Sequence, residues 1–326
     1  MAQWGDLADG VLVGRRVSRE QALDILTTPD SELLGLLQAA FDVRRRFFGT
    51  RVRIHVLVNA RSGNCSEDCH FCSQSASSNT EIDRYPMMSA DALVDDARRA
   101  HEARAWKYCI VTAMRAPDVR VIETICDAVR RIRQRYPMMI CCSLGLLTPS
   151  QAGSLKEAGV DRFNHNLETS ERFFPRICTT HTYADRVRTL RTAKEAGLSI
   201  CSGGILGMGE TDDDIVDLAM SLRDLDADSI PVNLLNPVPG TPLDSQNALT
   251  PQRCLKALAL FRFVNPDKDI RVAGGREVNL RHLQPLSLYA ANSIFAGGYL
   301  TTGGLPASDV HRMIEDLGFE IEEVRE

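Results

Sequence analysis

The sequence lacks the features that would place the protein in a membrane or on a nucleic acid. No stretch approaches the ~20 consecutive apolar residues of a membrane-spanning helix, and the first residues show no basic start followed by an apolar run of signal-peptide length. Charges of both signs are mixed, since 38 Lys and Arg against 43 Asp and Glu give a formal charge of -5 without a long block of either sign. We therefore expect a cytoplasmic protein with no membrane and no nucleic-acid partner.

Linkers, low-complexity segments and strong internal repeats are also missing, so we expect one domain in 326 residues. Short apolar runs alternate with amphipathic stretches of helical period, which is typical of α/β proteins. The eight expected strands lie near 52–58, 106–112, 138–144, 160–166, 198–205, 228–235, 269–273 and 291–295. This count predicts a (β/α)8 TIM barrel. The alternative is a doubly wound open sheet with a second domain, but the loop after the first strand lacks the GxGxxG that would favour it.

Residues with capping side chains mark where the helices should begin. Ser89, Thr148, Thr211 and Thr250 each precede an amphipathic stretch, and two of them are followed directly by proline. Two further helices are expected before the first strand, one of them starting at Ser18. The expected organisation is a helical N-terminal extension over 1–50, the barrel over 51–300, and a C-terminal loop and helix over 301–326.

Ten cysteines are too few for a disulfide framework in a chain of this length and too many to be packing residues alone. Cys65, Cys69 and Cys72 form a CxxxCxxC loop directly after the first expected strand. Barrel enzymes carry their chemistry at that end of the strands. Three thiolates without a fourth protein ligand favour an iron–sulfur cluster with one open iron. Structural zinc, which usually takes four ligands from paired CxxC units, is the alternative.

The expected strands have one apolar and one polar face. If the apolar faces meet the helices, the lumen receives polar side chains in place of the usual Val, Ile and Leu. Unpaired buried polar groups cost free energy, so we expect the lumen to enclose a polar ligand and a second metal centre. The candidates for that centre are Cys109, Cys141, Cys201 and Arg271. The alternatives are three buried free cysteines with an ion-paired arginine, or a one-residue register shift that exchanges Cys141 for Cys142.

The CxxxCxxC loop, with Phe71 before its last cysteine, resembles the radical S-adenosylmethionine superfamily. From about residue 50 to the C-terminus the chain resembles the biotin synthase family. The segments that carry this resemblance are CSEDCHFCSQS at 65–75, FNHNLETS at 163–170, TTHTYADR at 179–186, CSGGILGMGET at 201–211, SIPVNLLNPVPGTPL at 229–243, RVAGGREVNL at 271–280 and ANSIFAGGYLTT at 291–302.

The resemblance implies two iron–sulfur centres. One is a 4Fe–4S cluster on Cys65, Cys69 and Cys72, which would cleave S-adenosyl-L-methionine to a 5'-deoxyadenosyl radical. The other is a 2Fe–2S cluster whose expected ligands are the four lumen candidates, Cys109, Cys141, Cys201 and Arg271. The implied activity is the insertion of sulfur from this second cluster into dethiobiotin, which forms biotin. Unactivated C–H bonds are too inert for acid–base catalysis, which explains the need for a radical and an enclosed site.

The resemblance also assigns roles to polar residues near the lumen. S-adenosylmethionine would be bound by Phe71 at the adenine, Asn166 and Glu168 at the ribose, and Arg186 at the carboxylate. Dethiobiotin would be bound by Asn164, Asn233, Thr301 and Thr302. Amides suit its urea group, and each of the three asparagines could serve either this group or the ribose of S-adenosylmethionine. Glu168 departs from the family pattern, in which Asp or Asn is expected. The alternatives are turn or cap roles for Glu168 and the threonines, and a surface ion pair for Arg186.

The expected partners are a small electron-transfer protein of the flavodoxin or ferredoxin type and a second copy of the chain in a homodimer. Competing functions are another radical S-adenosylmethionine enzyme, such as a maturase or a mutase acting on a small amino acid, and a non-catalytic iron–sulfur or zinc-binding module. Cys126, Cys178 and Cys254 match no motif and are expected to be packing or surface thiols. His165 is expected to be a satisfied structural histidine on the face opposite the asparagines.

Overall fold

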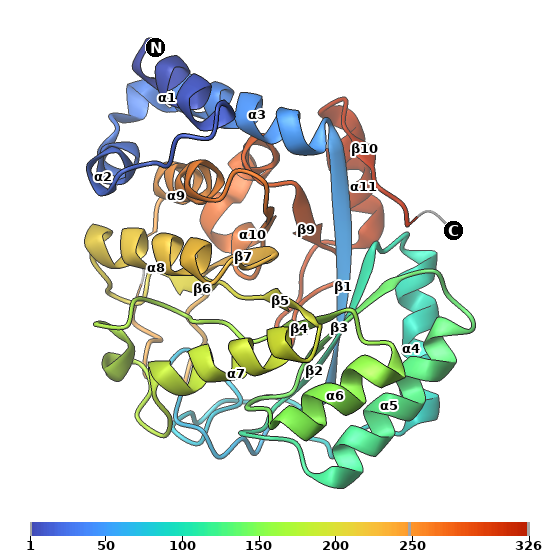
Figure 1. The fold of residues 1–326 in the computed structure, drawn as a ribbon. Coiled ribbons are helices and arrows are strands. Elements are labelled where there is room, and N and C mark those ends of the chain that lie inside the picture. Colours follow the sequence, from blue (N-terminus) through green and yellow to red (C-terminus); the bar gives the residue numbers. More distant parts are fainter. Residues whose placement is uncertain (1, 247–248, 325–326) are drawn as a thin grey trace.

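The computed structural model describes residues 2–246 and 249–324 of the chain, and its centre is a closed ring of parallel strands (Figure 1). These strands are β1 (Arg51–Arg61), β2 (Lys107–Thr112), β3 (Met139–Ser143), β4 (Arg162–Asn164), β5 (Ser199–Cys201), β6 (Gly204–Leu206), β7 (Ser229–Leu234), β8 (Asp269–Val272) and β9 (Ser293–Phe295). Each strand pairs with its successor except that β5 and β6 both pair with β7, and β9 returns to pair with β1. The ring confirms the predicted (β/α)8 barrel and excludes the open sheet.

The fifth predicted strand, 198–205, is interrupted and forms the two short strands β5 and β6. Gly203 lies at the break, where a Cβ atom would stand 1.9 Å from the carbonyl oxygen of Pro231. Ser202 next to it turns its hydroxyl to accept from the backbone N–H of Leu167 at 3.2 Å. The chain therefore leaves regular pairing here to pack closely on β7 and to bind the segment after β4.

Helices cover the outside of the ring. They are α4 (Ala90–Glu102), α5 (Val119–Arg133), α6 (Pro149–Ala158), α7 (Tyr183–Glu195), α8 (Asp212–Asp224), α9 (Pro251–Val264), α10 (Arg276–Leu280), α11 (Ala307–Asp316) and the 3-10 helices η2 (Phe174–Arg176) and η3 (Arg281–Tyr289). Ser89, Thr148, Thr211 and Thr250 each accept a hydrogen bond from the third helical N–H, as N-caps do. The predicted helix starts are thus confirmed.

Three helices precede the barrel, where two were predicted. They are α1 (Ala2–Leu12), α2 (Arg19–Thr27) and α3 (Leu33–Phe48), with the 3-10 helix η1 (Asp30–Glu32) before the last. The capping box of Ser18 and Gln21 starts α2 as predicted. Helix α1 contains two glycines, Gly5 and Gly10, but it packs on α3 and Trp4 is buried. Such tertiary packing is not visible in local propensity.

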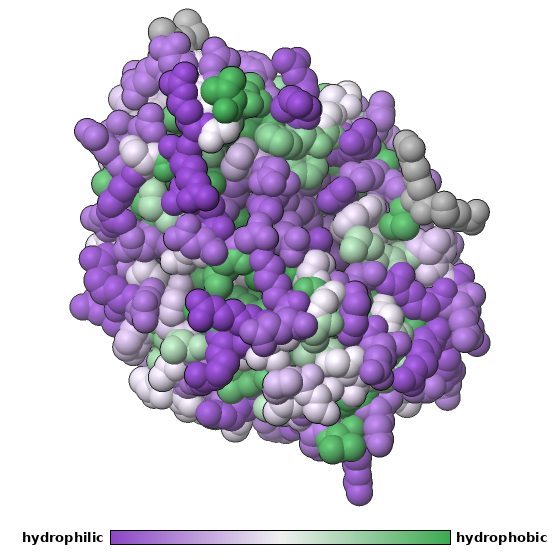
Figure 2. Space-filling view, viewed as in Figure 1, coloured by the Kyte–Doolittle hydropathy of each residue, from purple (hydrophilic) through white to green (hydrophobic). Residues whose placement is uncertain are grey.

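The C-terminal segment closes on the barrel. After α11 the chain forms a short strand, β10 (Glu320–Ile321), which pairs in parallel with the start of β1. Residues 325 and 326 of the predicted C-terminal segment lie outside the described part. In the described residues, no helix is long and apolar enough to cross a membrane. The face in Figure 2 is mostly hydrophilic, and its apolar side chains form small separate groups.

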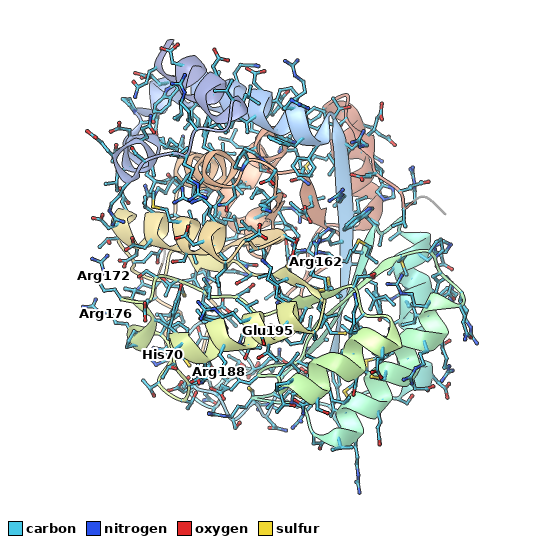
Figure 3. The ribbon with its side chains drawn as sticks, viewed as in Figure 1. His70, Arg162, Arg172, Arg176, Arg188 and Glu195 are labelled. Carbon is cyan, nitrogen blue, oxygen red and sulfur yellow. The ribbon has the colours of Figure 1, made fainter. Side chains whose placement is uncertain are left out.

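Within β3, β4 and β8 the two faces are occupied as predicted. Apolar side chains such as Ile110, Ile140 and Val272 are fully buried in one continuous core between the strands and the helices. The opposite faces turn polar side chains into the lumen. Arg162, labelled in Figure 3 among the strands, is one of them, whereas Arg188 and Glu195 belong to α7 on the outside.

Candidate active site

One cavity of about 340 Å³ connects the rim of the barrel with its interior. This volume is in the range of small-molecule sites. Most of the predicted site residues line it, namely Phe71, Cys72, Cys109, Cys141, Asn164, Asn166, Glu168, Arg186, Asn233, Arg271, Thr301 and Thr302. Of the other three, Cys69 and Cys201 contact the lining residues Arg186 and Arg271, and Cys65 lies in the same loop as Phe71. The structure thus brings residues from distant segments to one space.

The CxxxCxxC loop leaves the end of β1 and is closed by its own backbone. The N–H of Cys72 donates to the carbonyl of Cys69 at 3.1 Å, and the N–H of Cys65 to that of Gln74 at 3.2 Å. The side-chain oxygen of Gln74 accepts from Asn59 at 3.1 Å, which ties the loop to β1. Burial raises the pKa of the Cys72 thiol to about 11. A bound metal would favour the thiolate here, because metal binding displaces thiol protons.

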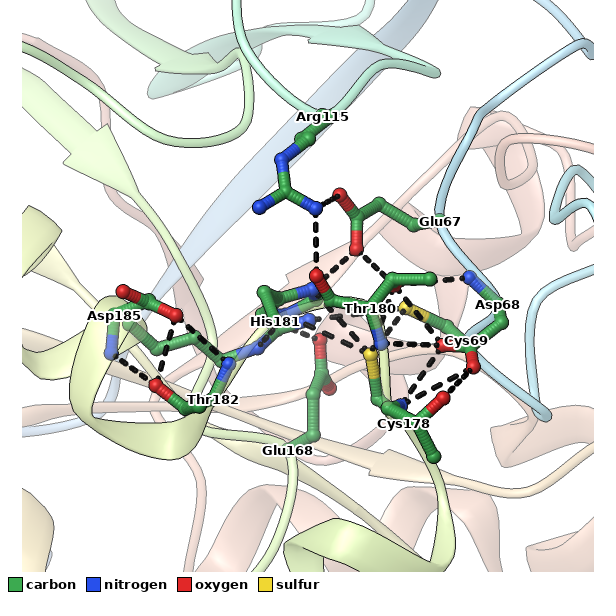
Figure 4. Close-up of polar contacts among 12 residues, drawn as sticks. Glu67, Asp68, Cys69, Arg115, Glu168, Cys178, Thr180, His181, Thr182 and Asp185 are labelled. Atoms are coloured by element: carbon green, nitrogen blue, oxygen red, sulfur yellow. Dashed lines mark hydrogen bonds and ion pairs between the residues drawn. The ribbon is translucent and has the colours of Figure 1, made fainter.

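A polar network lies beneath the loop (Figure 4). His181 Nδ1 contacts a carboxylate oxygen of Glu67, and it is 3.3 Å from Cys178 Sγ. Cys178 Sγ is in turn 3.8 Å from Cys69 Sγ. Cys178 is buried in the apolar cluster around Phe174, as expected of a packing thiol, and it also contacts Cys69 and His181. Its spacing from His181 along the chain was the one available sequence signal.

The hydrogen bonds of His181 identify its tautomer. Nε2 accepts from Nε of Arg186 at 2.9 Å, so Nδ1 carries the ring proton and donates toward Glu67. In this tautomer Nδ1 has no lone pair for a metal, although Glu67, Cys178 and His181 are close enough together to hold one. The network therefore orients Arg186 and supports the cysteine loop.

Arg186 is almost fully buried, which excludes the alternative of a surface ion pair. Nη1 donates to the backbone oxygen of Asn166 at 2.7 Å and lies 3.3 Å from a carboxylate oxygen of Glu168. Nη2 is 3.9 Å from Cys69 Sγ. The guanidinium thus stands between the cysteine loop and the segment after β4, with a face open to the cavity.

Glu168 adopts a backbone conformation that is unusual for its residue type. Its φ is 71°, in the left-handed region where Asn and Asp are better tolerated. This explains why a shorter residue is the family expectation. The carboxylate reaches Arg186 and Asn166, and burial raises the pKa of Glu168 although Arg186 opposes the shift. A buried carboxylate at the cavity wall is suited to hydroxyl donors.

Three thiols meet deeper in the barrel. Cys109 and Cys141 are opposite each other in the β2–β3 register, and Cys201 joins them from β5 in one buried group. A hydrogen bond with Cys141 lowers the pKa of the Cys109 thiol to about 7, against the effect of burial. Cys142 points into the outer core instead. The register thus puts Cys141 in the lumen, as the alternation of faces predicted.

Arg271 approaches the thiols from β8. Nη2 donates to Cys201 Sγ at 3.3 Å, and Nη1 contacts Nδ1 of His55. The alternative that Arg271 is paired with a carboxylate is not found, because no carboxylate lies within salt-bridge distance of Arg271 among the described residues. Arg271 therefore belongs to the thiol group.

The predicted substrate residues line the middle and upper part of the cavity. Asn233 is held by the backbone, donating to the oxygen of Gly204 at 3.1 Å and accepting from the N–H of Gly274 at 3.0 Å. Asn164 Nδ2 is 3.3 Å from Ser143 Oγ, and Thr301 Oγ1 is 2.7 Å from Ser73 Oγ. Rigid amides of this kind are preorganised for a ligand.

The prediction for His165 is wrong. It lines the cavity, and its Nε2 is buried without a hydrogen-bond partner. The physical reason is that β4 ends at Asn164, two residues before the predicted end of the strand at 166, so the alternation of faces does not extend to His165. His165 is therefore an additional candidate for ligand contact.

Other buried polar atoms in the barrel also lack partners. They are Nε2 of His55, Nζ of Lys107, Nη1 of Arg162, Oδ1 of Asn166 and Nε of Arg271. Each such atom costs about 1–3 kcal/mol when left unpaired. Thiols together with unpaired polar atoms fit a site for an iron–sulfur centre and a polar organic ligand, and they do not fit an apolar core.

Comparison with known proteins gives consistent matches. Residues 60–222 match the Radical SAM superfamily, and residues 231–320 match the Biotin and Thiamin Synthesis associated domain. The chain is 54% identical over 326 residues to Biotin synthase of Bacillus subtilis (strain 168), covering 100% of this chain and 97% of the relative. It is 55% identical over 322 residues to Biotin synthase of Geobacillus kaustophilus (strain HTA426), covering 99% and 97%.

Solved structures share the fold. Methylornithine synthase superposes with a TM-score of 0.85 at 20% identity, covering 97% of both chains. The FeFe-hydrogenase maturase from Carboxydothermus hydrogenoformans superposes with a TM-score of 0.81 at 17% identity, covering 98% of this chain and 79% of that one. At such identities the likeness concerns the barrel alone.

Proposed function

This chain belongs to the biotin synthase family, and we propose that the cavity inside its barrel is where sulfur is inserted into dethiobiotin to form biotin. The observation that carries this proposal is the continuity of the cavity. It runs from Cys72 and Arg186 at the rim to Cys109, Cys141 and Arg271 inside the barrel. A small substrate between the two ends would contact both centres while water is excluded.

Membership of the radical SAM superfamily implies a 4Fe–4S cluster and S-adenosylmethionine. We propose that Cys65, Cys69 and Cys72 hold this cluster, and that the buried fork of Arg186 binds the carboxylate of S-adenosylmethionine. Asn166 and Glu168 would accept from the ribose hydroxyls, and Phe71 would pack on the adenine. The support is their common lining of the cavity next to the cysteine loop.

We further propose that Cys109, Cys141, Cys201 and Arg271 hold a 2Fe–2S centre. The donor set supports this, because three thiols with one arginine converge in a buried space. When bound, the first cluster supplies the electron that cleaves S-adenosylmethionine, and the second supplies the sulfur atom. The chain's own residues would hold dethiobiotin between them, with Asn164 and Asn233 at the urea group and Thr301 and Thr302 at the carboxylate.

The organisation that we propose is one domain, with an extension over 1–50, a barrel over 51–300 and a terminal segment over 301–326. Support comes from the closure of the ring, which needs β7, β8 and β9 from the second matched region as well as strands from the first. We also propose a cytoplasmic location, in keeping with ten free cysteines. An electron-transfer protein of the flavodoxin or ferredoxin type and a homodimer complete the proposal, by resemblance to the family.

The decisive experiment combines product analysis with cluster counting. Anaerobically reconstituted protein, given dethiobiotin, S-adenosylmethionine and a reductant, should release biotin detectable by mass spectrometry. Cys141→Ala should lose one of two spectroscopically distinct clusters while S-adenosylmethionine cleavage remains measurable. Cys142→Ala is the matched control, because this neighbour faces the outer core.

Two outcomes would contradict the proposal. If wild-type protein cleaves S-adenosylmethionine but yields neither biotin nor a thiol intermediate, the substrate assignment is wrong and a maturase-like or mutase-like activity becomes the better candidate. If Cys141→Ala keeps both clusters and its turnover, the lumen cysteines do not hold the sulfur donor.

A further inference from the structure

Next to the three lumen thiols the barrel contains a group of buried charged side chains, which we call the barrel floor. It consists of Lys107 on β2, Arg162 on β4 and Asp269 on β8. Lys107 precedes Cys109 by two residues and Asp269 precedes Arg271 by two, so strand alternation puts each on the same lumen face as its cluster candidate. Arg162 is opposite Cys141 in the β3–β4 register. The floor is therefore continuous with the thiol group.

Lys107 is the least satisfied member of the floor. Its side chain has no exposed surface, and Nζ has no hydrogen-bond partner. The nearest aromatic ring is that of Trp106, whose centroid is 5.9 Å from Nζ, at the outer limit of a cation–π contact. An isolated buried ammonium group is strongly destabilising, so an anionic partner is expected nearby.

Asp269 does not fill that role alone. Its carboxylate accepts from Ser293 Oγ at 2.6 Å and from Ser229 Oγ at 3.0 Å, and it lies 3.5 Å from Arg162 Nη1. Asp269 is therefore an anion whose contacts are already made by neighbours other than Lys107.

The remaining groups leave the floor positively charged. A guanidinium has only donors, so Nδ1 of His55 accepts from Nη1 of Arg271, carries no proton, and leaves the imidazole neutral. Arg53, the next cation along β1, is paired with Glu322 at 3.0 Å. The cations Lys107, Arg162 and Arg271 thus face one carboxylate in a space closed to solvent.

The charge of an oxidised 2Fe–2S centre matches this excess. Two ferric ions, two sulfides and three thiolates carry one net negative charge. If Arg271 binds iron as a neutral ligand, Lys107, Arg162 and Asp269 leave one positive charge. The net charges of the barrel floor and of the centre would then cancel.

We propose that Lys107 is a positioning residue for the auxiliary centre, and that with Arg162 and Asp269 it neutralises the negative charge of that centre. The inference rests on the proposed function, because it takes Cys109, Cys141, Cys201 and Arg271 as the ligands. It adds residues that tune the centre without binding iron or substrate.

The test is a redox titration of the auxiliary centre in the anaerobically reconstituted full-length protein, followed by absorbance and electron paramagnetic resonance. Lys107→Met removes a buried positive charge, so the ratio of reduced to oxidised centre at the wild-type midpoint should fall about tenfold, ~59 mV for one electron. Asp269→Asn should shift the ratio in the opposite direction. The double variant should return toward wild type, and Lys107→Arg should restore most of the wild-type potential.

A lysine outside the lumen supplies the matched control. Lys256 is also largely buried, but its Nζ binds Asp30 at 2.6 Å in the helical layer. Lys256→Met should leave the potential of the auxiliary centre unchanged. Since a purely structural role predicts loss of the centre in both single variants, opposite shifts distinguish charge balance from packing.

The possible outcomes separate this inference from the proposed function. A wild-type protein that assembles one cluster only would refute the auxiliary centre itself. Two clusters in wild type, with the same potential in Lys107→Met and Asp269→Asn, would refute the charge balance alone. If Lys107→Met does not fold, Asp269→Asn decides, because an unchanged or lowered potential in that variant overturns the proposal.

Discussion

Replacing Arg186 by lysine should weaken the binding of S-adenosylmethionine without removing the charge. The guanidinium uses separate nitrogens for His181, for the backbone oxygen of Asn166 and for the region of Cys69. A lysine has one nitrogen on a longer flexible stem and cannot serve all three directions. The His181 ring and the Asn166 carbonyl would then compete with the ligand carboxylate for a single ammonium group.

The size of the effect follows from the number of contacts that are lost. Hydrogen bonds to charged groups contribute about 1.5–3 kcal/mol each. Loss of one such bond to the ligand in Arg186→Lys should therefore weaken S-adenosylmethionine binding by about 2 kcal/mol, or roughly 30-fold. Protein stability should also fall by about 1–2 kcal/mol, since a buried acceptor is left without a donor.

Equilibrium dialysis with labelled S-adenosylmethionine, on protein with a counted 4Fe–4S cluster, measures this directly. Arg188→Lys is the matched control, because Arg188 lies two residues further along α7 with its side chain 69% exposed (Figure 3). That variant should bind like wild type. Equal affinities of wild type and Arg186→Lys, with equal cluster content, would refute the role of the guanidinium fork.

Other changes test the framework around the site. Glu168→Asp should gain up to about 1 kcal/mol in unfolding free energy, because aspartate tolerates a φ of 71° better, yet bind S-adenosylmethionine more weakly in the same dialysis, because the carboxylate retreats from the ribose. Thr148→Ala removes the capping box of α6 and should lower the unfolding free energy in urea by about 1 kcal/mol. Burial opposes ionisation of Asp214, but hydrogen bonds from Ser170 and Thr211 outweigh it and lower the pKa of Asp214. The stabilisation from Asp214 is therefore present above its unfolded pKa of about 3.9 and is lost as the pH falls below that value. The difference in unfolding free energy between wild type and Asp214→Asn should accordingly shrink between about pH 5 and pH 2. A difference in urea midpoints that stays constant over this range would contradict the assignment.

The sequence predicted those parts of the site that depend on local pattern. Strand alternation placed Cys141 in the lumen and Cys142 outside, and the structure agrees because β3 is regular over its five residues. The caps of α4, α6, α8 and α9 followed from hydroxyl side chains that bond to nearby backbone, a strictly local interaction. The resemblance to a known family predicted the candidate residues at the rim of the cavity.

The parts that could not be predicted depend on contacts between distant segments. Cys178 contacts Cys69, which lies 109 positions away in the sequence, so no local pattern predicts the pair. His165 faces the cavity because β4 ends one residue before it, and the strand end is set by pairing with β5. In the sequence, Lys107 is an ordinary lysine at the start of an expected strand. Its burial follows only from closure of the ring.

The vertical order of the site is a consequence of strand geometry. The segment that begins with β4 carries Arg162 at the barrel floor, Asn164 in the middle of the cavity, and Asn166 and Glu168 at the rim. Within the strand, two residues advance by about 6.6 Å and return to the same face, so each level of the lumen receives one polar side chain. A one-residue shift of β4 would turn Phe163 inward and Asn164 into the apolar layer. The register of β4 therefore fixes Arg162 at the barrel floor and Asn164 in the cavity together, and a strand slip would displace both.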